Sequence, residues 1–262
     1  MAKIETLLKN KNYRVRRGRG KLPKNPSIIR ERLKPRLYDY TYIMTLSFRE
    51  TFERMLELVG KKASPLKILD LGCGYKPYQA FFPNDQYIGV DLDLNSYADV
   101  IANNEQLPFK DNVFDVIILS EVLEHCDNEY QVVSELKRVA KNQALVYLSI
   151  PFIFPLHGIP HDFNRFTKYK LQSLFKRDKI ILLRGSNNLF ASLFIFSNIV
   201  VRILFGTLKI IYPIYIVNNL LSLAVGQLSR LYRDKKGFIA EYWDYALSAF
   251  PIGYSMIVRI KK

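Results

Sequence analysis

Cysteine is scarce in this chain of 262 residues, which holds only Cys73 and Cys126. Two cysteines so far apart support neither a disulfide framework nor a cysteine-rich zinc site. The first residues also lack the apolar stretch of a secretory signal peptide, so we expect a reducing, cytoplasmic compartment. Apolar residues, by contrast, make up 49% of the chain, which is enough to bury a full core and excludes disorder of the whole.

Acidic residues are nearly absent from the N-terminal part of the chain. Residues 1–36 hold 13 Lys and Arg against two Glu, so this stretch carries +11 of the formal net charge of +15. Residues 1–27 have too few apolar side chains to bury and too much like charge to collapse, so we predict a disordered basic tail. Such a tail either contacts an anionic partner, phospholipid head groups or nucleic acid, or serves only solubility.

Two hydrophobic patterns follow the tail. In segment 28–64 apolar residues recur at steps of three and four, which predicts one or two helices, interrupted near Pro35. Segment 65–186 alternates apolar runs of strand length with helical patterns, which predicts an α/β core with a doubly wound, mostly parallel sheet. The predicted strands are 67–71, 86–90, 113–119, 144–150 and 179–183, the predicted helices are 121–140 and 168–175, and 251–262 supplies a last strand.

Charged residues become rare again between 187 and 229, where only Arg202 and Lys209 occur. The uncharged run 210–229 is long enough to cross a hydrocarbon core of about 30 Å, but one proline and two asparagines within it disfavour a simple crossing. We therefore predict that an apolar insertion, 187–250, forms helices that lie in the membrane plane or re-enter it. A water-soluble cap or a dimer interface is the alternative.

The turn after the first predicted strand carries a motif with chemical content. The sequence Asp70-Leu-Gly72-Cys-Gly74 stands at the carboxyl end of a strand, where open α/β sheets bind ligands. The two glycines let the backbone approach a ligand closely. Asp91 ends the next strand, where a carboxylate can accept hydrogen bonds from both hydroxyls of a ribose. The motif predicts a site for a cofactor that contains a nucleoside.

With three further segments, this motif resembles the class I S-adenosylmethionine (SAM)-dependent methyltransferases, especially their small-molecule and cell-envelope branch of the type 11 kind. The matching segments are 70–74, 90–93, 105–109 and 114–125, and the likeness covers roughly 65–186. The resemblance implies SAM as cofactor. It also implies a Rossmann-like seven-stranded sheet, with helices before it and the apolar insertion before its last strand.

The resemblance also implies roles for single residues. Gly72 and Gly74 line the methionine part of SAM, Asp70 reaches its amino group, and Asp91 holds its ribose. Three further residues belong to the expected cofactor site: Asn103 and Glu105 in the stretch beside the adenine, and Ser120 beneath the sulfonium. The family often has an acidic residue where Asn103 stands, but an amide oxygen can also accept from an exocyclic amine. The third glycine of a dinucleotide motif is missing, which disfavours a nicotinamide dehydrogenase.

The acceptor residues are expected in the segment after strand 144–150. His157 and His161 are four positions apart, but Gly158 and Pro160 forbid the helix that would aim both at one metal, so we predict no metal site. The run from His161 to Thr167 resembles a stretch of methyltransferases that act on envelope glycans and lipids.

This stretch suggests His161, with Asp162 nearby, as a general base toward an acceptor hydroxyl. An ion pair between Asp162 and Arg165 that braces the loop is an equal alternative. His125, His157 and Arg165 are candidate acceptor contacts.

These features predict a SAM-dependent methyltransferase that acts on a membrane-associated acceptor, such as a lipid-linked glycan, a lipid or an isoprenoid. We expect a cytoplasmic protein, peripheral or monotopic at the inner face of the cell membrane. The alternatives are an RNA or other nucleic-acid methyltransferase that uses the basic tail, and a non-catalytic membrane scaffold. A nucleic-acid partner is not favoured, because Ser120-Glu-Val-Leu123 stands where enzymes that methylate base nitrogens carry an (Asp/Asn/Ser)-Pro-Pro-aromatic motif.

Overall fold

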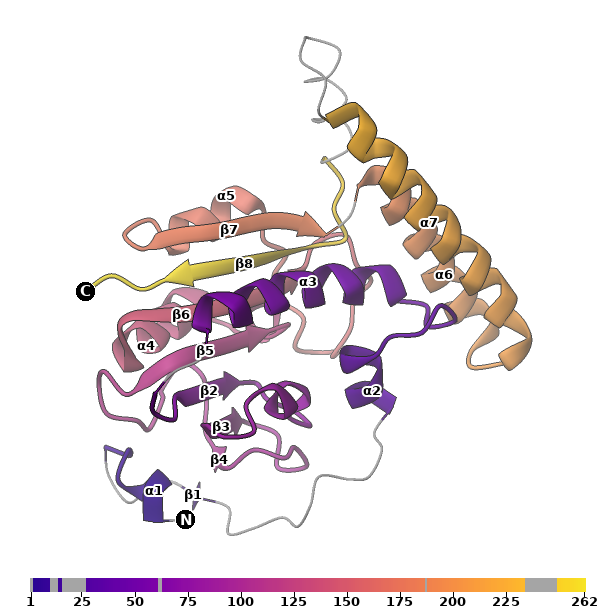
Figure 1. The fold of residues 1–262 in the computed structure, drawn as a ribbon. Coiled ribbons are helices and arrows are strands. Elements are labelled where there is room, and N and C mark those ends of the chain that lie inside the picture. The colour runs from indigo at the N-terminus through magenta and orange to yellow at the C-terminus, as the bar shows by residue number, and fades with distance from the viewer. Residues whose placement is uncertain (1, 10–13, 16–26, 61–62, 187, 234–248) are drawn as a thin grey trace.

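The structure, a computed structural model, describes residues 2–9, 14–15, 27–60, 63–186, 188–233 and 249–262. Within them, one sheet of eight strands runs in the order β1-β4-β3-β2-β5-β6-β8-β7 (Figure 1). The strands are β1 Arg14–Val15, β2 Lys67–Leu71, β3 Gln86–Asp91, β4 Val100–Ile101, β5 Phe114–Ser120, β6 Ala140–Pro151, β7 Lys179–Ser186 and β8 Gly253–Arg259.

The five central strands are parallel. β3 pairs with β2 and β4, and β5 pairs with β2 and β6, whereas β8 runs antiparallel to both β6 and β7. After β2 the chain adds β3 and β4 on one side, and after β5 it adds β6 on the other. The strand order thus reverses between β2 and β5, and open α/β sheets bind ligands at the carboxyl ends of the strands at such a point. The predicted mostly parallel, doubly wound sheet is confirmed. The two-residue β1 adds an antiparallel edge to the seven expected strands.

Helices cover both faces of the sheet (Figure 1). Successive side chains of β2 point to opposite faces of the sheet. Ile68 packs with Phe52 and Met55 of α3 on one face, and Leu69 shares a core with Leu136 of α4 on the other. The helices are α1 Ala2–Glu5, α2 Ser27–Leu33, α3 Tyr42–Val59, α4 Glu129–Val139, α5 Lys168–Leu174, α6 Leu189–Phe205 and α7 Tyr212–Arg233, with 3-10 turns η1 Pro77–Phe81, η2 Leu123–His125 and η3 Lys209–Ile211. The expected break near Pro35 separates α2 from α3.

One helix begins later than the sequence pattern indicates. The helical pattern over 121–140 corresponds to η2 followed by α4, which starts at Glu129. The side chain of Asn128 caps α4 by accepting from Gln131 N–H at 3.1 Å. The segment 121–126 is therefore free to form a loop beside the carboxyl end of β5.

Part of the basic tail is ordered against the core. Leu7 and Leu8 are buried, and Leu8 forms a β-bridge with Phe109. Lys9 N–H donates to Pro108 O at 2.7 Å. The prediction of a disordered tail is therefore wrong for residues 2–9 and 14–15, because this apolar pair finds a partner about 100 positions along the chain. The rest of the tail lies outside the described residues.

The apolar insertion forms a helical hairpin, α6 and α7, which pack side by side next to the N-terminal end of α3 (Figure 1). Polar side chains fix this hairpin. Asn198 and Asn219 are fully buried and share a hydrogen bond of 3.2 Å, and Asn219 also donates to Leu37 O at 2.7 Å and Asp39 O at 3.1 Å. Asn219, one of the two asparagines that disfavour a membrane crossing, thus attaches the hairpin to the connection between α2 and α3.

Candidate active site

The turn after β2 and the end of β3 form one unit. Cys73 N–H donates to Val90 O at 3.0 Å, and Gly74 N–H donates to Asp91 Oδ2 at 2.8 Å. Asp91 Oδ1 accepts from Asp93 N–H at 2.9 Å. Each carboxylate oxygen keeps a further lone pair, which a ribose hydroxyl can use. The fold therefore brings the predicted residues Gly74 and Asp91 together.

The two glycines of the motif have different roles. Both have positive φ, +61° at Gly72 and +47° at Gly74, which favours glycine. A Cβ at Gly72 would lie only 2.4 Å from Val122 Cγ2, so this glycine is required for packing against the loop after β5. A Cβ at Gly74 would meet no atom of the described residues within 4 Å. Gly74 is the glycine that opens onto a ligand.

Asp70 is a buried carboxylate with one hydrogen-bond donor. Its residue is 2% exposed, and it accepts a hydrogen bond from the Tyr87 hydroxyl. Burial raises the pKa of Asp70 to about 7, although Tyr87 and the nearby Lys76 favour the charged form. A cationic group bound at this position would stabilise the carboxylate, as the predicted contact with the amino group of SAM requires.

Asn103 and Glu105 make local contacts. Asn103 is exposed, and its Oδ1 accepts from Glu105 N–H at 2.9 Å. Glu105 Oε1 accepts from Asn128 N–H at 3.0 Å, so this carboxylate ties the adenine stretch to the start of α4. Their contacts with the cofactor stay predictions.

Ser120, at the end of β5, belongs to a network that the sequence analysis missed. Its hydroxyl lies 2.8 Å from the Tyr78 hydroxyl and 2.7 Å from Ser149 Oγ. Arg32 of α2 donates to Ser120 Oγ at 3.2 Å and forms an ion pair with Glu121. No local pattern indicates that Arg32 reaches a strand 88 positions away. The expected sulfonium region is thus lined by a guanidinium, a carboxylate and three hydroxyls.

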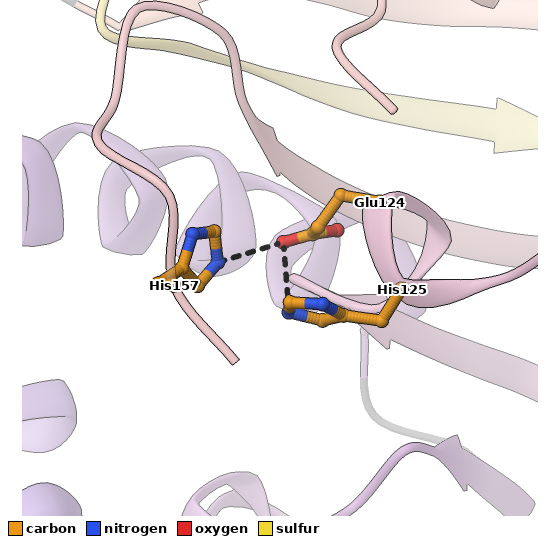
Figure 2. Close-up of side chains that lie close together, drawn as sticks. All are labelled: Glu124, His125 and His157. Carbon is orange, nitrogen blue, oxygen red and sulfur yellow. Dashed lines mark ion pairs between the residues drawn. The ribbon is translucent and has the colours of Figure 1, made fainter. Parts of the chain in front are cut away.

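Behind this network, Glu124, His125 and His157 converge (Figure 2). Glu124 Oε1 lies 3.7 Å from His157 Nε2 and 3.9 Å from His125 Nε2. Burial raises the pKa of Glu124, and the neighbouring Glu124 carboxylate raises the pKa of His157. Sequence reasoning named both histidines as acceptor contacts but missed the carboxylate between them, because η2 and the loop after β6 meet only in the fold.

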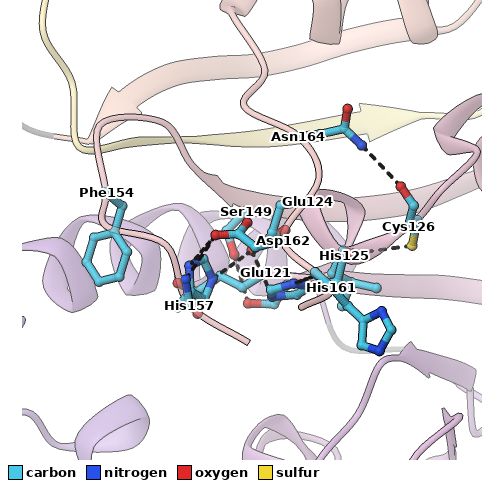
Figure 3. A network of polar contacts seen from close by, with 12 residues as sticks. Glu121, Glu124, His125, Cys126, Ser149, Phe154, His157, His161, Asp162 and Asn164 are labelled. Atoms are coloured by element: carbon cyan, nitrogen blue, oxygen red, sulfur yellow. Dashed lines mark hydrogen bonds and ion pairs between the residues drawn. The ribbon is translucent and has the colours of Figure 1, made fainter. Parts of the chain in front are cut away.

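Asp162, which Figure 3 shows beside His157, forms an ion pair with Arg165 that braces the loop after β6. Arg165 donates to both carboxylate oxygens of Asp162, at 2.5 and 2.7 Å, and to the backbone oxygens of Phe154 and Pro155, both at 3.3 Å. The guanidinium holds the pKa of Asp162 well below its usual range. The predicted ion pair is therefore present. Arg165 is committed to the loop rather than presented to an acceptor.

His161 lies apart from this centre. Its residue is exposed, and its backbone oxygen, not its ring, accepts from His125 Nδ1 at 2.6 Å. Asp162 instead approaches His157, with Oδ2 3.3 Å from Nδ1. The expected pairing of His161 with Asp162 is corrected: Asp162 orients His157, because the loop turns back between the two histidines. A role for His161 as base stays a prediction.

A cavity of about 400 Å³ adjoins the site. Glu121 and His157 line one part of it, and Arg32 and Tyr78 connect it to the network around Ser120. Its other walls come from α3 and its surroundings and include six apolar or aromatic residues: Tyr40, Met44, Phe48, Phe52, Phe81 and Phe154. Glu31, Thr41, Thr45 and Arg49 add polar groups to these walls. The cavity can therefore take a molecule that has both polar groups and an extended apolar part.

The strand order, the glycine turn after β2 and the acidic residue after β3 fit the Rossmann-like fold of the class I methyltransferases that the sequence resembles. The residues fit its cofactor: Asp70 offers a buried charge for the amino group, Gly74 leaves open space, and Asp91 presents free lone pairs to the ribose. Residues 69–148 match the family model described as a methyltransferase domain.

Two proteins of Methanocaldococcus jannaschii, both described as uncharacterized, are similar to this chain. One is 34% identical over 83 residues, which are 29% of this chain and 36% of that protein. The other is 32% identical over 90 residues, which are 31% of this chain and 43% of that protein. The match thus spans less than half of each relative.

Among solved structures, a protein of Galdieria sulphuraria provisionally assigned as a sarcosine dimethylglycine methyltransferase is similar, with a TM-score of 0.50 and 15% identity. The superposition covers 83% of this chain and 86% of that chain. At this identity the likeness concerns the fold.

Proposed function

We propose that the whole chain is a SAM-dependent methyltransferase whose acceptor is a membrane-associated amphiphile, such as a lipid, a lipid-linked glycan or an isoprenoid. The polar group of the acceptor would lie at Glu121 and His157, and its apolar part along the aromatic wall of the cavity. The enzyme would work at the cytoplasmic face of the membrane, held there by the hairpin and the basic tail.

The observation that carries this proposal is the position of the cavity between the site and the hairpin. Tyr40, which lines the cavity, lies beside both hairpin helices: its ring centroid is 5.7 Å from the Arg202 guanidinium carbon and 6.4 Å from the Tyr215 ring centroid. An apolar chain that leaves a membrane beside the hairpin therefore has a short route to His157. A small soluble acceptor would need neither the hairpin nor an apolar wall.

The outer surface of the hairpin is unusually apolar. Ile203, Leu204 and Ile210 are 68, 69 and 82% exposed. They are accompanied by further exposed apolar residues of the hairpin: Leu193, Phe196, Phe205, Leu208, Val217 and Leu220. Contiguous exposed apolar surface of this kind marks a membrane or protein contact. Within the described residues, Lys209–Gln227 is long and apolar enough to cross a membrane, by length and composition only.

The docking of the hairpin favours an in-plane position over a crossing. Asn219 donates to two backbone oxygens of the α2–α3 connection, and a crossing α7 would have to break both hydrogen bonds and place this amide in hydrocarbon. An in-plane hairpin keeps these contacts and buries only its outer face. The +11 charge of residues 1–36 adds attraction to anionic head groups.

The chain's part in the reaction is mainly positioning. Bound SAM supplies a methyl group on a sulfonium, which is already a good leaving group. Asp70 would bind the amino group of the cofactor and Asp91 its ribose, and the Asp162–Arg165 pair fixes the loop that carries His157. The network of Arg32, Tyr78 and Ser120 lies where the cofactor side meets the acceptor cavity.

The decisive experiment is methyl transfer from deuterated SAM in the presence of membrane extracts of the source cells. We expect label in a lipid-soluble product with wild-type protein, and none with Gly74→Val, whose side chain enters the open cofactor space while the packed Gly72 is untouched. Label that appears only in RNA, or in no fraction despite SAM binding, would refute the membrane acceptor.

Sedimentation with vesicles tests the hairpin separately. Leu204→Ser with Ile210→Ser should weaken binding to neutral and anionic vesicles by at least about tenfold, because each buried apolar side chain contributes about 1.5–3 kcal/mol. The matched control, Tyr130→Ser with Tyr169→Ser, removes two exposed aromatic residues on the far side of the sheet and should bind as wild type. Equal binding by both double variants contradicts the proposal.

A further inference from the structure

Glu124 is a buried carboxylate without a hydrogen bond. Its side chain is 0% exposed, and neither Oε1 nor Oε2 has a hydrogen-bond partner among the described residues. A buried carboxylate is costly unless it is paired with a cation or coordinates a metal. The nearest complementary groups are the two imidazoles of His125 and His157.

Both imidazoles point their Nε2 atoms toward the Glu124 carboxylate. His125 Nδ1 lies 2.6 Å from His161 O, and a backbone oxygen can only accept, so Nδ1 carries the proton. His157 Nδ1 lies 3.2 Å from Pro155 O and 3.3 Å from Asp162 Oδ2, which again places the proton on Nδ1. In the neutral rings both Nε2 atoms therefore keep their lone pairs, and both point toward Glu124 Oε1 (Figure 2). Three acceptor atoms face one another without a donor between them.

The spacing of these atoms fits a cation. The three donor atoms all lie within 4.8 Å of one another, and the two distances to Glu124 Oε1 are 3.7 and 3.9 Å. Tetrahedral ligands at about 2.1 Å from a cation lie about 3.4 Å from one another, so all three donor atoms have to move closer together when the cation binds. The contact of Asp162 with His157 is the carboxylate–histidine arrangement that orients metal-bound imidazoles.

We propose that Glu124, His125 and His157 bind one divalent transition-metal ion. Two imidazoles and one carboxylate suit Zn²⁺ or Mn²⁺ better than Mg²⁺ or Ca²⁺, which prefer oxygen ligands. Three protein ligands leave coordination positions open. Because His157 lines the cavity, those open positions face the space where the acceptor binds.

This inference rests on the proposed function in one respect, since it names the chemistry of the acceptor: an oxygen nucleophile, such as a hydroxyl. The cation polarises the acceptor O–H and lowers its pKa. The proton leaves to water in the cavity, the oxygen attacks the methyl carbon, the C–S bond breaks, and its electron pair stays on sulfur. The products are the methyl ether and S-adenosylhomocysteine.

The test is calorimetric titration of the full-length protein, stripped with a chelator, with ZnCl₂, MnCl₂ and MgCl₂. We expect one Zn²⁺ or Mn²⁺ per chain, and Mg²⁺ bound at least about tenfold more weakly. Glu124→Gln and His157→Ala should each lower the Zn²⁺ affinity at least 100-fold. Asp162→Asn, which leaves the three ligands in place, should lower it about 10–100-fold. His161→Ala is the matched control, because this neighbouring exposed ring is no ligand, and it should bind Zn²⁺ as wild type.

Two additional measurements keep the outcomes separate. Co²⁺ added to the stripped wild-type protein should give visible d–d absorption bands that Zn²⁺ abolishes, and their absence overturns the site even if a variant fails to fold. SAM titration of the same samples should be unaffected by Glu124→Gln. If Zn²⁺ binding survives both ligand substitutions, the metal site is overturned. If the wild-type protein still binds SAM in that case, the proposed methyltransferase function stands. If the wild-type protein binds Zn²⁺ but not SAM, the proposed function is refuted and the metal site stands.

Discussion

Replacement of the buried Asp70 by Asn should stabilise the protein in the absence of cofactor while it weakens cofactor binding. The change keeps the shape of the side chain and an oxygen that accepts from Tyr87, but it removes the charge. A rise of the Asp70 pKa from 3.8 to about 7 corresponds to about 4 kcal/mol, at about 1.4 kcal/mol per pH unit. The ionised wild type is less stable than its protonated form by that amount.

The sign of the pH dependence follows from proton binding. The unfolded chain loses the Asp70 proton near pH 4, whereas the folded chain keeps it until about pH 7. The folded state therefore binds more protons in this window, so the Asp70 contribution to stability decreases as pH rises from 4 to 7 and is constant above 7. Between pH 5 and pH 8, the advantage of Asp70→Asn over wild type should grow by about 2–3 kcal/mol.

Denaturant unfolding at pH 5, 6.5 and 8, without SAM, measures this difference directly. The new amide N–H groups of Asn have no prepared partner and cost about 1–3 kcal/mol, but this cost is the same at every pH. The matched control is Asp91→Asn, which removes a carboxylate of the same candidate cofactor site at the half-exposed end of β3 and should weaken SAM binding. A stability difference between Asp70→Asn and wild type that stays flat from pH 5 to 8 would refute the reasoning.

Three further predictions concern packing. Gly72→Ala should destabilise the fold by about 1–3 kcal/mol, because its Cβ overlaps Val122 and its φ is positive, and Val122→Ala in the same chain should recover part of this loss in thermal unfolding. Gly74→Ala should cost at most about 1 kcal/mol of stability and act mainly on SAM affinity, measured by calorimetry; a loss confined to stability would contradict an open cofactor space. Leu8→Ala should lower stability by about 2 kcal/mol and speed proteolysis within residues 2–9, whereas unchanged values would mean that this segment is not packed against Phe109.

Most of the sheet could be predicted because its strands are hydrophobic on both faces. The expected strand at 67–71 agrees with β2, and the run at 86–90 differs from β3 by one residue. The two-residue β4 was missed, because no periodicity can be read from so short a segment. The apolar spacing over 121–140 predicts one helix, because Val122 and Leu123 share the periodicity of the residues after 130. In the fold, segment 121–126 instead contributes side chains to the site, and the N-cap at Asn128 sets the start of α4.

The positions of the residues expected to bind the cofactor were predictable from a local motif, but the side chains that line the cavity were not. Asp70, Gly74 and Asp91 stand at strand ends, where sequence position determines location. A metal site was rejected by considering only His157 and His161, two neighbours on one loop. The fold instead joins His157 to Glu124 and His125 from η2, and a single sequence contains no signal for a contact across 30 positions.

Arg32 lies between the hairpin side of the molecule and the candidate active site. The connection between α2 and α3 supplies the backbone oxygens that hold Asn219 of the hairpin, and Asp39 in that connection is paired with Arg30 at 3.1 Å. Two residues after Arg30 on α2, Arg32 reaches Ser120 and Glu121 at the carboxyl end of β5. If the hairpin binds the membrane as proposed, a shift of the hairpin on this connection would reach a guanidinium that donates to Ser120 and lines the cavity.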